Sequence, residues 1–187
     1  MRLGRRYLWV FGAGLVTISI GLLFLFSQNP VASQSLADQD TTVPFTHRVH
    51  VQEVGINCQF CHSFARRAPQ AGLPSLDKCM ICHKYFTVED PEGQQAVDRL
   101  ISAVQTDQAP QWLDVYKQPD FVYFSHQPHV QAGVSCVSCH GDVPNMELVQ
   151  KQVDMNMGFC LNCHLKQADE HPDVDIRRLT DCNTCHK

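Results

Sequence analysis

Charged residues are absent from residues 7–37 of this 187-residue chain, and no cysteine precedes residue 58. The lack of an early cysteine excludes a lipoprotein-type acyl anchor. The uncharged stretch includes a continuous apolar run at residues 7–26, about 20 residues, which is enough to cross a bilayer as a helix. A cleavable signal has an apolar stretch of only about 7–15 residues. We therefore predict that residues 1–30 hold a cytoplasmic tip and a retained transmembrane helix, followed by a linker at 31–42.

Two short stretches keep a removed signal peptide open as an alternative, because VAS at 31–33 and SLA at 35–37 are acceptable cleavage sites. The three arginines near the start, Arg2, Arg5 and Arg6, predict a cytoplasmic N-terminus. The rest of the chain is then expected on the opposite, extracytoplasmic side of the cell membrane.

Basic residues are scarce beyond the N-terminal segment. Three of the 15 Lys and Arg precede residue 30, which leaves 12 against 19 Asp and Glu and a net formal charge of −7. Such a surface disfavours binding to nucleic acid, because phosphates need cationic partners. An acidic surface could attract a basic patch on a redox partner, but a solvated acidic surface is the more common explanation.

No cysteine stands outside a Cys-x-x-Cys pair, and each pair is followed directly by a histidine. Zinc sites use similar pairs without needing an adjacent His, and a disulfide framework needs no His. Covalent haem attachment predicts the adjacent His in all five cases. The haem-binding cysteines are then Cys58, Cys61, Cys79, Cys82, Cys136, Cys139, Cys160, Cys163, Cys182 and Cys185, and the proximal iron ligands are His62, His83, His140, His164 and His186.

Five c-type haems would leave about 30 residues for each, well below a normal protein core. We therefore predict a mainly α and irregular fold, in which residues 43–187 pack around haem with little regular secondary structure.

A duplication organises this domain. FTHRVHVQEVGINCQFCH at 45–62 resembles FSHQPHVQAGVSCVSCH at 124–140, and a second attachment motif follows each copy. We predict two modules at 43–83 and 122–164, a helical connector at 84–121, and a C-terminal haem segment at 165–187. Within the connector, Asp90-Pro91-Glu92 is typical of a helix start. Apolar residues then follow at helical spacing from Ala96 to Val104, which predicts an amphipathic helix packed on the domain.

Five further histidines remain for the distal positions: His47, His50, His126, His129 and His171. They suffice to give every haem two His ligands. A lone His is usually just a hydrogen-bonded polar residue, but two matched His-x-x-His pairs before attachment motifs are not explained in that way.

The repeated pattern F-[ST]-H-x-x-H … G-[IV]-x-C-x-x-C-H resembles the cytochrome c7/c3 class of multihaem cytochromes. In that class the first His of the pair binds the haem that follows, and the second binds a different haem. The resemblance implies that His47 and His126 serve the haems at Cys58/Cys61 and Cys136/Cys139. His50 and His129 would each reach a neighbouring haem.

A larger set of stretches resembles the pentahaem cytochrome c subunit of alternative complex III, over about residues 43–187. They are INCQFCHSFARRAPQAGLPSLDKCMICH, PDFVYFSHQPHVQAGVSCVSCHG, MNMGFCLNCH and LTDCNTCHK. This resemblance implies an electron-transfer subunit of a quinol:acceptor oxidoreductase, with no substrate site of its own. It also implies an iron–sulfur subunit, polytopic quinol-binding membrane subunits and a monohaem cytochrome as partners, and a soluble electron acceptor.

The fifth distal ligand has two candidates. His171 completes the histidine count, whereas the family resemblance points to Met157 in Met-Gly-Phe-Cys, with Met155 as a further option. Methionines usually fill gaps in an apolar core, but a Met/His pair would raise that haem's potential.

Two other functions stay open: a self-standing membrane-anchored quinol dehydrogenase or shuttle, and a multihaem reductase. A reductase needs a haem with an open position, and the ligand count, together with the lack of a Cys-x-x-Cys-Lys motif, weighs against it.

Overall fold

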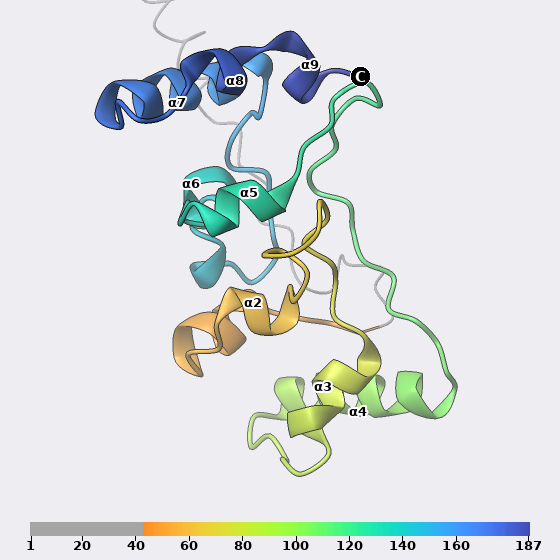
Figure 1. The fold of residues 1–187 in the computed structure, drawn as a ribbon. Coiled ribbons are helices and arrows are strands. Elements are labelled where there is room, and N and C mark those ends of the chain that lie inside the picture. The colour runs from red at the N-terminus through yellow and green to blue at the C-terminus, as the bar shows by residue number, and fades with distance from the viewer. Residues whose placement is uncertain (1–42) are drawn as a thin grey trace, which may run out of the picture. The chain divides into compact units, whose positions relative to one another are not determined.

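A computed structural model describes residues 43–187, and there the chain is a succession of short helices joined by irregular segments (Figure 1). The predicted membrane segment at 1–30 and the linker at 31–42 lie outside the described residues. Within the described part, no helix combines the length and the apolar character that a membrane span requires.

The helices occur in an order that follows the attachment motifs. They are the π-helix η2 (Arg48–Glu53), α2 (Cys58–Cys61), α3 (Leu76–His83), α4 (Pro91–Gln105), α5 (His126–Gln131), α6 (Val137–His140), the 3₁₀-helix η3 (Val143–Asn145), α7 (Met157–Glu170), α8 (Ile176–Thr180) and α9 (Cys182–Cys185). Residues 43–187 contain no strand, only an isolated bridge between Val122 and His186. The predicted mainly α and irregular fold is confirmed for this part of the chain.

The two copies of the repeat differ at one place, and the difference has a local cause. The first copy has one residue more, and its helix η2 is a π-helix, whereas the corresponding α5 is an α-helix. A π-helix accommodates an inserted residue without breaking the helix. Both helices then end before a glycine with positive φ, Gly55 at 80° and Gly133 at 81°. Glycine takes this left-handed conformation at little cost, which explains its place in the repeated pattern.

The connector helix α4 forms as the sequence predicts. The Asp90 carboxylate accepts a hydrogen bond from the Gly93 N–H at 2.7 Å, and Pro91 occupies the first turn. Val97, Leu100 and Ala103 are buried along one face. Leu100 and Ala103 form a small cluster with Val43, and α3 contributes Leu76, Cys79 and Met80 against it.

This cluster holds most of the buried apolar side chains in the described part of the chain; Ala65 and Val97 complete that set. Helices α3 and α4 lie side by side, and α7, α8 and α9 form a second group that includes the C-terminus (Figure 1). So small a protein core is what we expect of a chain in which haem supplies much of the packing.

Candidate haem-binding site

Three attachment motifs coincide with the one-turn helices α2, α6 and α9, and the other two lie within the longer helices α3 and α7. Asn57 and Asp181 cap the one-turn helices α2 and α9, and their side chains accept hydrogen bonds from the Gln59 and Asn183 N–H groups at 2.9 and 2.8 Å. Asn156 caps α7 in the same manner. A single helical turn places the two cysteines and the following histidine on one side, so local sequence alone builds each motif.

Most of the motif and repeat histidines are oriented by a hydrogen bond at Nδ1. The ring donates to a backbone carbonyl, and the pairs are His50 with Thr46 (2.8 Å), His62 with Gly72 (2.7 Å), His126 with Pro69 (2.8 Å), His129 with Ser125 (2.8 Å), His164 with Leu179 (2.9 Å) and His186 with Phe121 (3.3 Å). A proton held on Nδ1 leaves the lone pair on Nε2, the nitrogen available to a metal.

Four pairs of histidine rings face one another. The ring centroids are 6.4 Å apart for His47 and His62, 5.9 Å for His50 and His83, 6.2 Å for His126 and His140, and 6.0 Å for His129 and His164. A metal–imidazole nitrogen bond of about 2 Å puts each ring centroid about 3 Å from the metal, so rings on opposite faces of one haem iron lie about 6 Å apart. The residues present therefore fit a haem held between each pair.

The pairing of distal and proximal histidines is the same in both repeats. The first His of each His-x-x-His faces the proximal His of the next motif, as His47 faces His62 and His126 faces His140. The second His faces the proximal His of the motif after that, His83 or His164. Each short helix therefore reaches two attachment motifs at once and fixes them as neighbours.

Burial keeps several of these rings neutral. It lowers the pKa of His47 from 6.5 to about 4, with smaller contributions from His62 and His50. Burial also lowers the pKa of His83 and of His140. A neutral imidazole is the form that binds iron, so the local electrostatics and the ring geometry point to the same role.

The first and third motifs are neighbours in space although the second lies between them in sequence. The loop that follows His62 carries Pro69, whose carbonyl accepts hydrogen bonds from both the N–H and the Nδ1 of His126. The Gln131 amide donates to the Arg66 carbonyl of the same loop at 3.1 Å. Burial raises the pKa of the Cys136 thiol, and the neighbouring Cys58 raises it further.

The fourth and fifth motifs adjoin each other in the group formed by α7, α8 and α9. His164 of the fourth motif donates to Leu179 on α8, which contacts α9. Burial raises the pKa of the Cys160 thiol, and Cys185 of the fifth motif is the next contributor. The motifs therefore follow one another in space in the order second, first, third, fourth, fifth.

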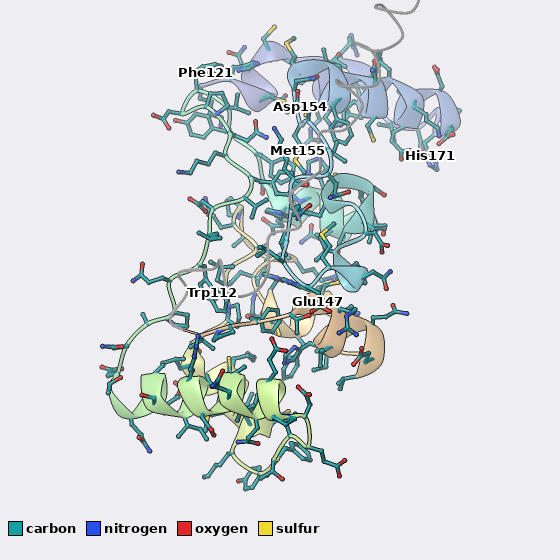
Figure 2. The ribbon with its side chains drawn as sticks, turned by 180° about the vertical axis from the view of Figure 1, so that it is seen from behind. Trp112, Phe121, Glu147, Asp154, Met155 and His171 are labelled. Carbon is teal, nitrogen blue, oxygen red and sulfur yellow. The ribbon has the colours of Figure 1, made fainter. Side chains whose placement is uncertain are left out.

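The fifth proximal histidine stands apart from the other four. His186 stacks on Phe121, with ring centroids 5.8 Å apart, and the segment around Phe121 also binds α9 through the Tyr123 N–H and the Cys185 carbonyl at 2.7 Å. His171 ends α7. Figure 2 places His171 and Phe121 at opposite ends of this group of helices.

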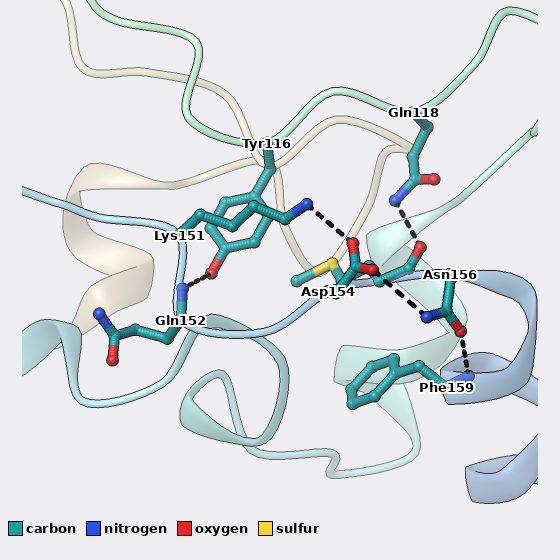
Figure 3. A network of polar contacts seen from close by, with 8 residues as sticks. Tyr116, Gln118, Lys151, Gln152, Asp154, Asn156 and Phe159 are labelled. Atoms are coloured by element: carbon teal, nitrogen blue, oxygen red, sulfur yellow. Dashed lines mark hydrogen bonds and ion pairs between the residues drawn. The ribbon is translucent and has the colours of Figure 1, made fainter. Parts of the chain in front are cut away.

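The methionine candidates lie on the segment that leads into α7. Met157 begins the helix, and its side chain is 62% exposed. The Gln118 amide donates to the Met155 carbonyl at 3.4 Å, and Tyr116 accepts a hydrogen bond from the Gln152 N–H at 3.0 Å (Figure 3). Because Gln118 is three residues from Phe121, these contacts hold residues 152–155 near the strip of chain that binds His186.

Some contributors to the site were not predicted from the sequence. Phe45 and Phe124 each lie against both histidines of their repeat, with centroids 4.5–4.9 Å away. Both phenylalanines occupy the first position of the repeated motif, and this recurrence could have indicated a role at the site. The carbonyls of Pro69, Gly72 and Leu179 carry no signal in the sequence, because any residue supplies a carbonyl.

Two family models match different parts of the chain. The model described as cytochrome c7 and related cytochrome c matches residues 122–187, and the one described as the class III cytochrome c family matches residues 25–110. These matches support electron transfer by a multihaem c-type cytochrome with covalently bound haem.

One curated relative is similar over almost the whole chain. It is the multihaem cytochrome c subunit of a menaquinone reductase from Nitratidesulfovibrio vulgaris strain Hildenborough, 27% identical over 94% of this chain and 90% of its own length. The similarity thus extends across both modules, the connector and the C-terminal segment.

Proposed function

We propose that the chain is the electron-transfer subunit of a membrane-bound quinol:acceptor oxidoreductase of the alternative complex III type. The observation that carries the proposal is the set of four facing histidine pairs, each joining one repeat helix to an attachment motif. When bound, five c-type haems supply reversible one-electron oxidation and reduction of iron. The chain itself supplies the thioether cysteines, the axial ligands and the spacing between sites.

The proposed bis-histidine ligand sets are His47/His62, His50/His83, His126/His140 and His129/His164. Every one of these sites is filled by two side chains of this chain, which suits a relay and leaves no open position for a substrate. This is why a multihaem reductase is the weaker interpretation.

The route that we propose follows the spatial order of the motifs. One end is the second motif on α3, and the other is the fifth motif on α9. The hydrogen bonds at Pro69 and Leu179 support this order, because each joins a ligand of one site to the chain beside the next. Electrons entering at one end would pass singly through the first, third and fourth sites.

For the fifth site we propose His186 with Met157 as the distal ligand. The placement of His171 at the far end of the α7–α9 group supports a methionine over His171 (Figure 2). Met155, held near the same strip by Gln118, is the alternative methionine. Redox titration with EPR on Met157→Leu, Met155→Leu and His171→Ala separates them. A high-spin haem produced by His171→Ala, with both Met→Leu variants unchanged, contradicts the assignment.

We also propose that residues 1–30 anchor the chain in the cell membrane, with the N-terminus cytoplasmic and the haem domain extracytoplasmic. The length of the apolar run and the three early arginines support this placement. N-terminal sequencing of the membrane form should begin near Met1. A start close to Asp38 would instead indicate a processed signal peptide.

The proposed partners are an iron–sulfur subunit, polytopic quinol-binding subunits, a monohaem cytochrome and a soluble acceptor. The relative's name, a subunit of a menaquinone reductase, supports a quinone-linked complex. That name describes quinone reduction, whereas the alternative complex III resemblance implies quinol oxidation. The two resemblances therefore imply opposite directions of electron flow, and the identity of the co-purifying partners distinguishes them.

The test is extraction of the native membrane in a mild detergent, followed by identification of the co-purifying subunits. We expect an iron–sulfur protein and polytopic membrane proteins, and an intact mass for this chain equal to the polypeptide plus five haems. Quinol oxidation by the chain purified alone would instead support a self-standing dehydrogenase. Fewer than five haems on the matured chain would contradict the proposed haem count.

A further inference from the structure

The second sites of the two modules are built from equivalent residues, yet their histidine rings differ in orientation. The His129 and His164 planes are inclined by 21°, whereas those of His50 and His83 are inclined by 56°. The first sites of the modules show no such difference, with 5° for His47 and His62 and 6° for His126 and His140.

The distal histidines do not cause this difference. His50 and His129 each bind the carbonyl four residues earlier at 2.8 Å, and each lies against the phenylalanine of its repeat, at 4.5 and 4.8 Å. Their surroundings therefore match closely, and the cause must lie with the proximal rings.

The proximal rings differ in what holds them. His164 donates its Nδ1 proton to the Leu179 carbonyl at 2.9 Å. Among the described residues, His83 is the histidine whose Nδ1 is buried without a hydrogen-bond partner. A ring nitrogen bound to a carbonyl is fixed in orientation and becomes a stronger electron donor to its metal. His83 lacks both effects.

We propose that the His50/His83 pair gives the haem at Cys79/Cys82 the highest reduction potential of the four bis-histidine sites, and a spectroscopic signature of tilted axial ligands. The inference rests on the proposed bis-histidine ligation. The inclination of the rings separates this site from the other three, because His47 and His140 are likewise not among the histidines whose Nδ1 donates to a carbonyl. Inclined rings favour the ferrous state relative to parallel rings, and the unanchored His83 is a weaker donor than the anchored His164. His129/His164, with both rings hydrogen-bonded, is expected to hold the lowest of the four.

The consequence of a high reduction potential depends on where the site lies in the molecule. The second motif lies at one end of the spatial order of motifs, beside α4. A high-potential terminal site retains an arriving electron longest. In such a transfer a ferrous neighbour would become ferric and the terminal iron ferrous, with no proton or bond exchanged. Among the four bis-histidine sites, His50 and His83 would thereby make this one the site where electrons collect.

The experiment uses the detergent-solubilised full-length holoprotein and its EPR spectrum at very low temperature. Low-spin ferric haems with inclined axial imidazoles give a strongly anisotropic signal with a large maximum g value, whereas nearly parallel rings give ordinary rhombic signals. We expect the wild type to show one large-g signal that His50→Met removes. The matched control, His129→Met, should remove a rhombic signal and leave the large-g signal in place. Methionine can bind haem iron, so both variants are expected to keep a six-coordinate ligand set.

A redox titration of the wild type provides the second readout and needs no variant. Reduction makes each haem EPR-silent in this region, so the large-g signal should disappear before the rhombic bis-histidine signals as the potential is lowered. The proposal is overturned if large-g signals are unchanged in His50→Met, if none is present, or if that signal is reduced last. These outcomes do not depend on which subunits co-purify, so they are distinguishable from a failure of the proposed complex.

Discussion

The two modules contain the same motif but pack against different parts of the chain. Comparing the histidine rings at equivalent sites shows which features of the geometry come with the motif. Their first sites are almost superimposable in ring geometry, 6.4 Å and 5° against 6.2 Å and 6°. Their second sites diverge, with 56° between the His50 and His83 rings against 21° between those of His129 and His164. The motif thus determines which histidines face each other, but not the angle between the rings at the second site of each module.

The largest effect is expected from removing a central rather than a terminal site. In Cys58→Ser/Cys61→Ser, loss of the first haem should also disturb the third site, because the loop after His62 holds His126 through Pro69. Intact mass should fall by at least one haem, with an additional high-spin signal. The matched variant Cys79→Ser/Cys82→Ser should lose one haem and leave the other sites low-spin. Equal damage in both variants would contradict the spatial order of the motifs.

The next effect concerns the core that only the first module shares with the connector. Leu100→Ala leaves a cavity between α4 and α3, and should lower the free energy of unfolding by about 2–5 kcal/mol. Chemical denaturation followed by circular dichroism measures this change. Leu113→Ala, at a side chain that is 59% exposed, should change stability by less than about 0.5 kcal/mol. Similar losses in the two variants would show that the α3–α4 cluster does not stabilise the module.

A smaller effect is expected from acid. The pKa of His47 is about 4 in the folded chain against 6.5 when free, so the unfolded chain binds more protons between these values. Stability should therefore fall as the pH drops from 6.5 to 4, by about 2 kcal/mol for this partly exposed ring. Iron ligation requires the neutral ring and acts in the same direction.

Thermal melts at pH 7 and pH 4.5, followed at the haem absorbance, measure this dependence. His47→Met keeps a possible iron ligand but removes the titrating group, so its pH dependence should be shallower than that of the wild type. Some dependence should remain, because burial also lowers the pKa of His83 and His140. An unchanged slope in His47→Met would exclude this histidine as the source.

The smallest effect on stability is expected from replacing a residue of the first module by its counterpart in the second. Arg48, between the two distal ligands of the first module, forms ion pairs with Glu147 and Glu53, and the second module has Gln127 in its place. Because the paired side chains are more than 40% exposed, Arg48→Gln should cost less than about 1 kcal/mol. The control Gln127→Arg should be neutral. A loss of several kcal/mol in Arg48→Gln would mean that the pair holds η2 against η3.

Much of this site could be predicted from the sequence because it depends on local spacing. One helical turn builds each attachment motif, the repeat exposes the His-x-x-His pairs, and the connector helix follows from Asp90-Pro91 and its apolar face. The facing ring pairs agree with the ligand sharing that the cytochrome c7/c3 resemblance implied, although iron ligation itself stays a prediction.

The remaining features depend on contacts between distant residues. The motif order in space follows from Pro69 against His126 and Leu179 against His164, and these contacts use backbone carbonyls. The angle between the His50 and His83 rings depends on the tertiary arrangement of η2 and α3, which no pattern of residue types reveals. Predicting the π-helix η2 would have required knowledge that the extra residue of the first repeat lies within the helix rather than in the following loop.

The order of the distal ligands in the sequence also matters for a chain that is synthesised N-terminus first. His47, His50, His126 and His129 all precede the motifs that they face, so each distal side chain has already emerged when its attachment site does. Pro69 emerges before His126, and Phe121 before His186. The first module can therefore close as soon as residue 83 emerges, and its finished loop offers the contact on which the second module closes. In this order of synthesis, the distal histidine of each of these four sites is already present when the attachment motif emerges.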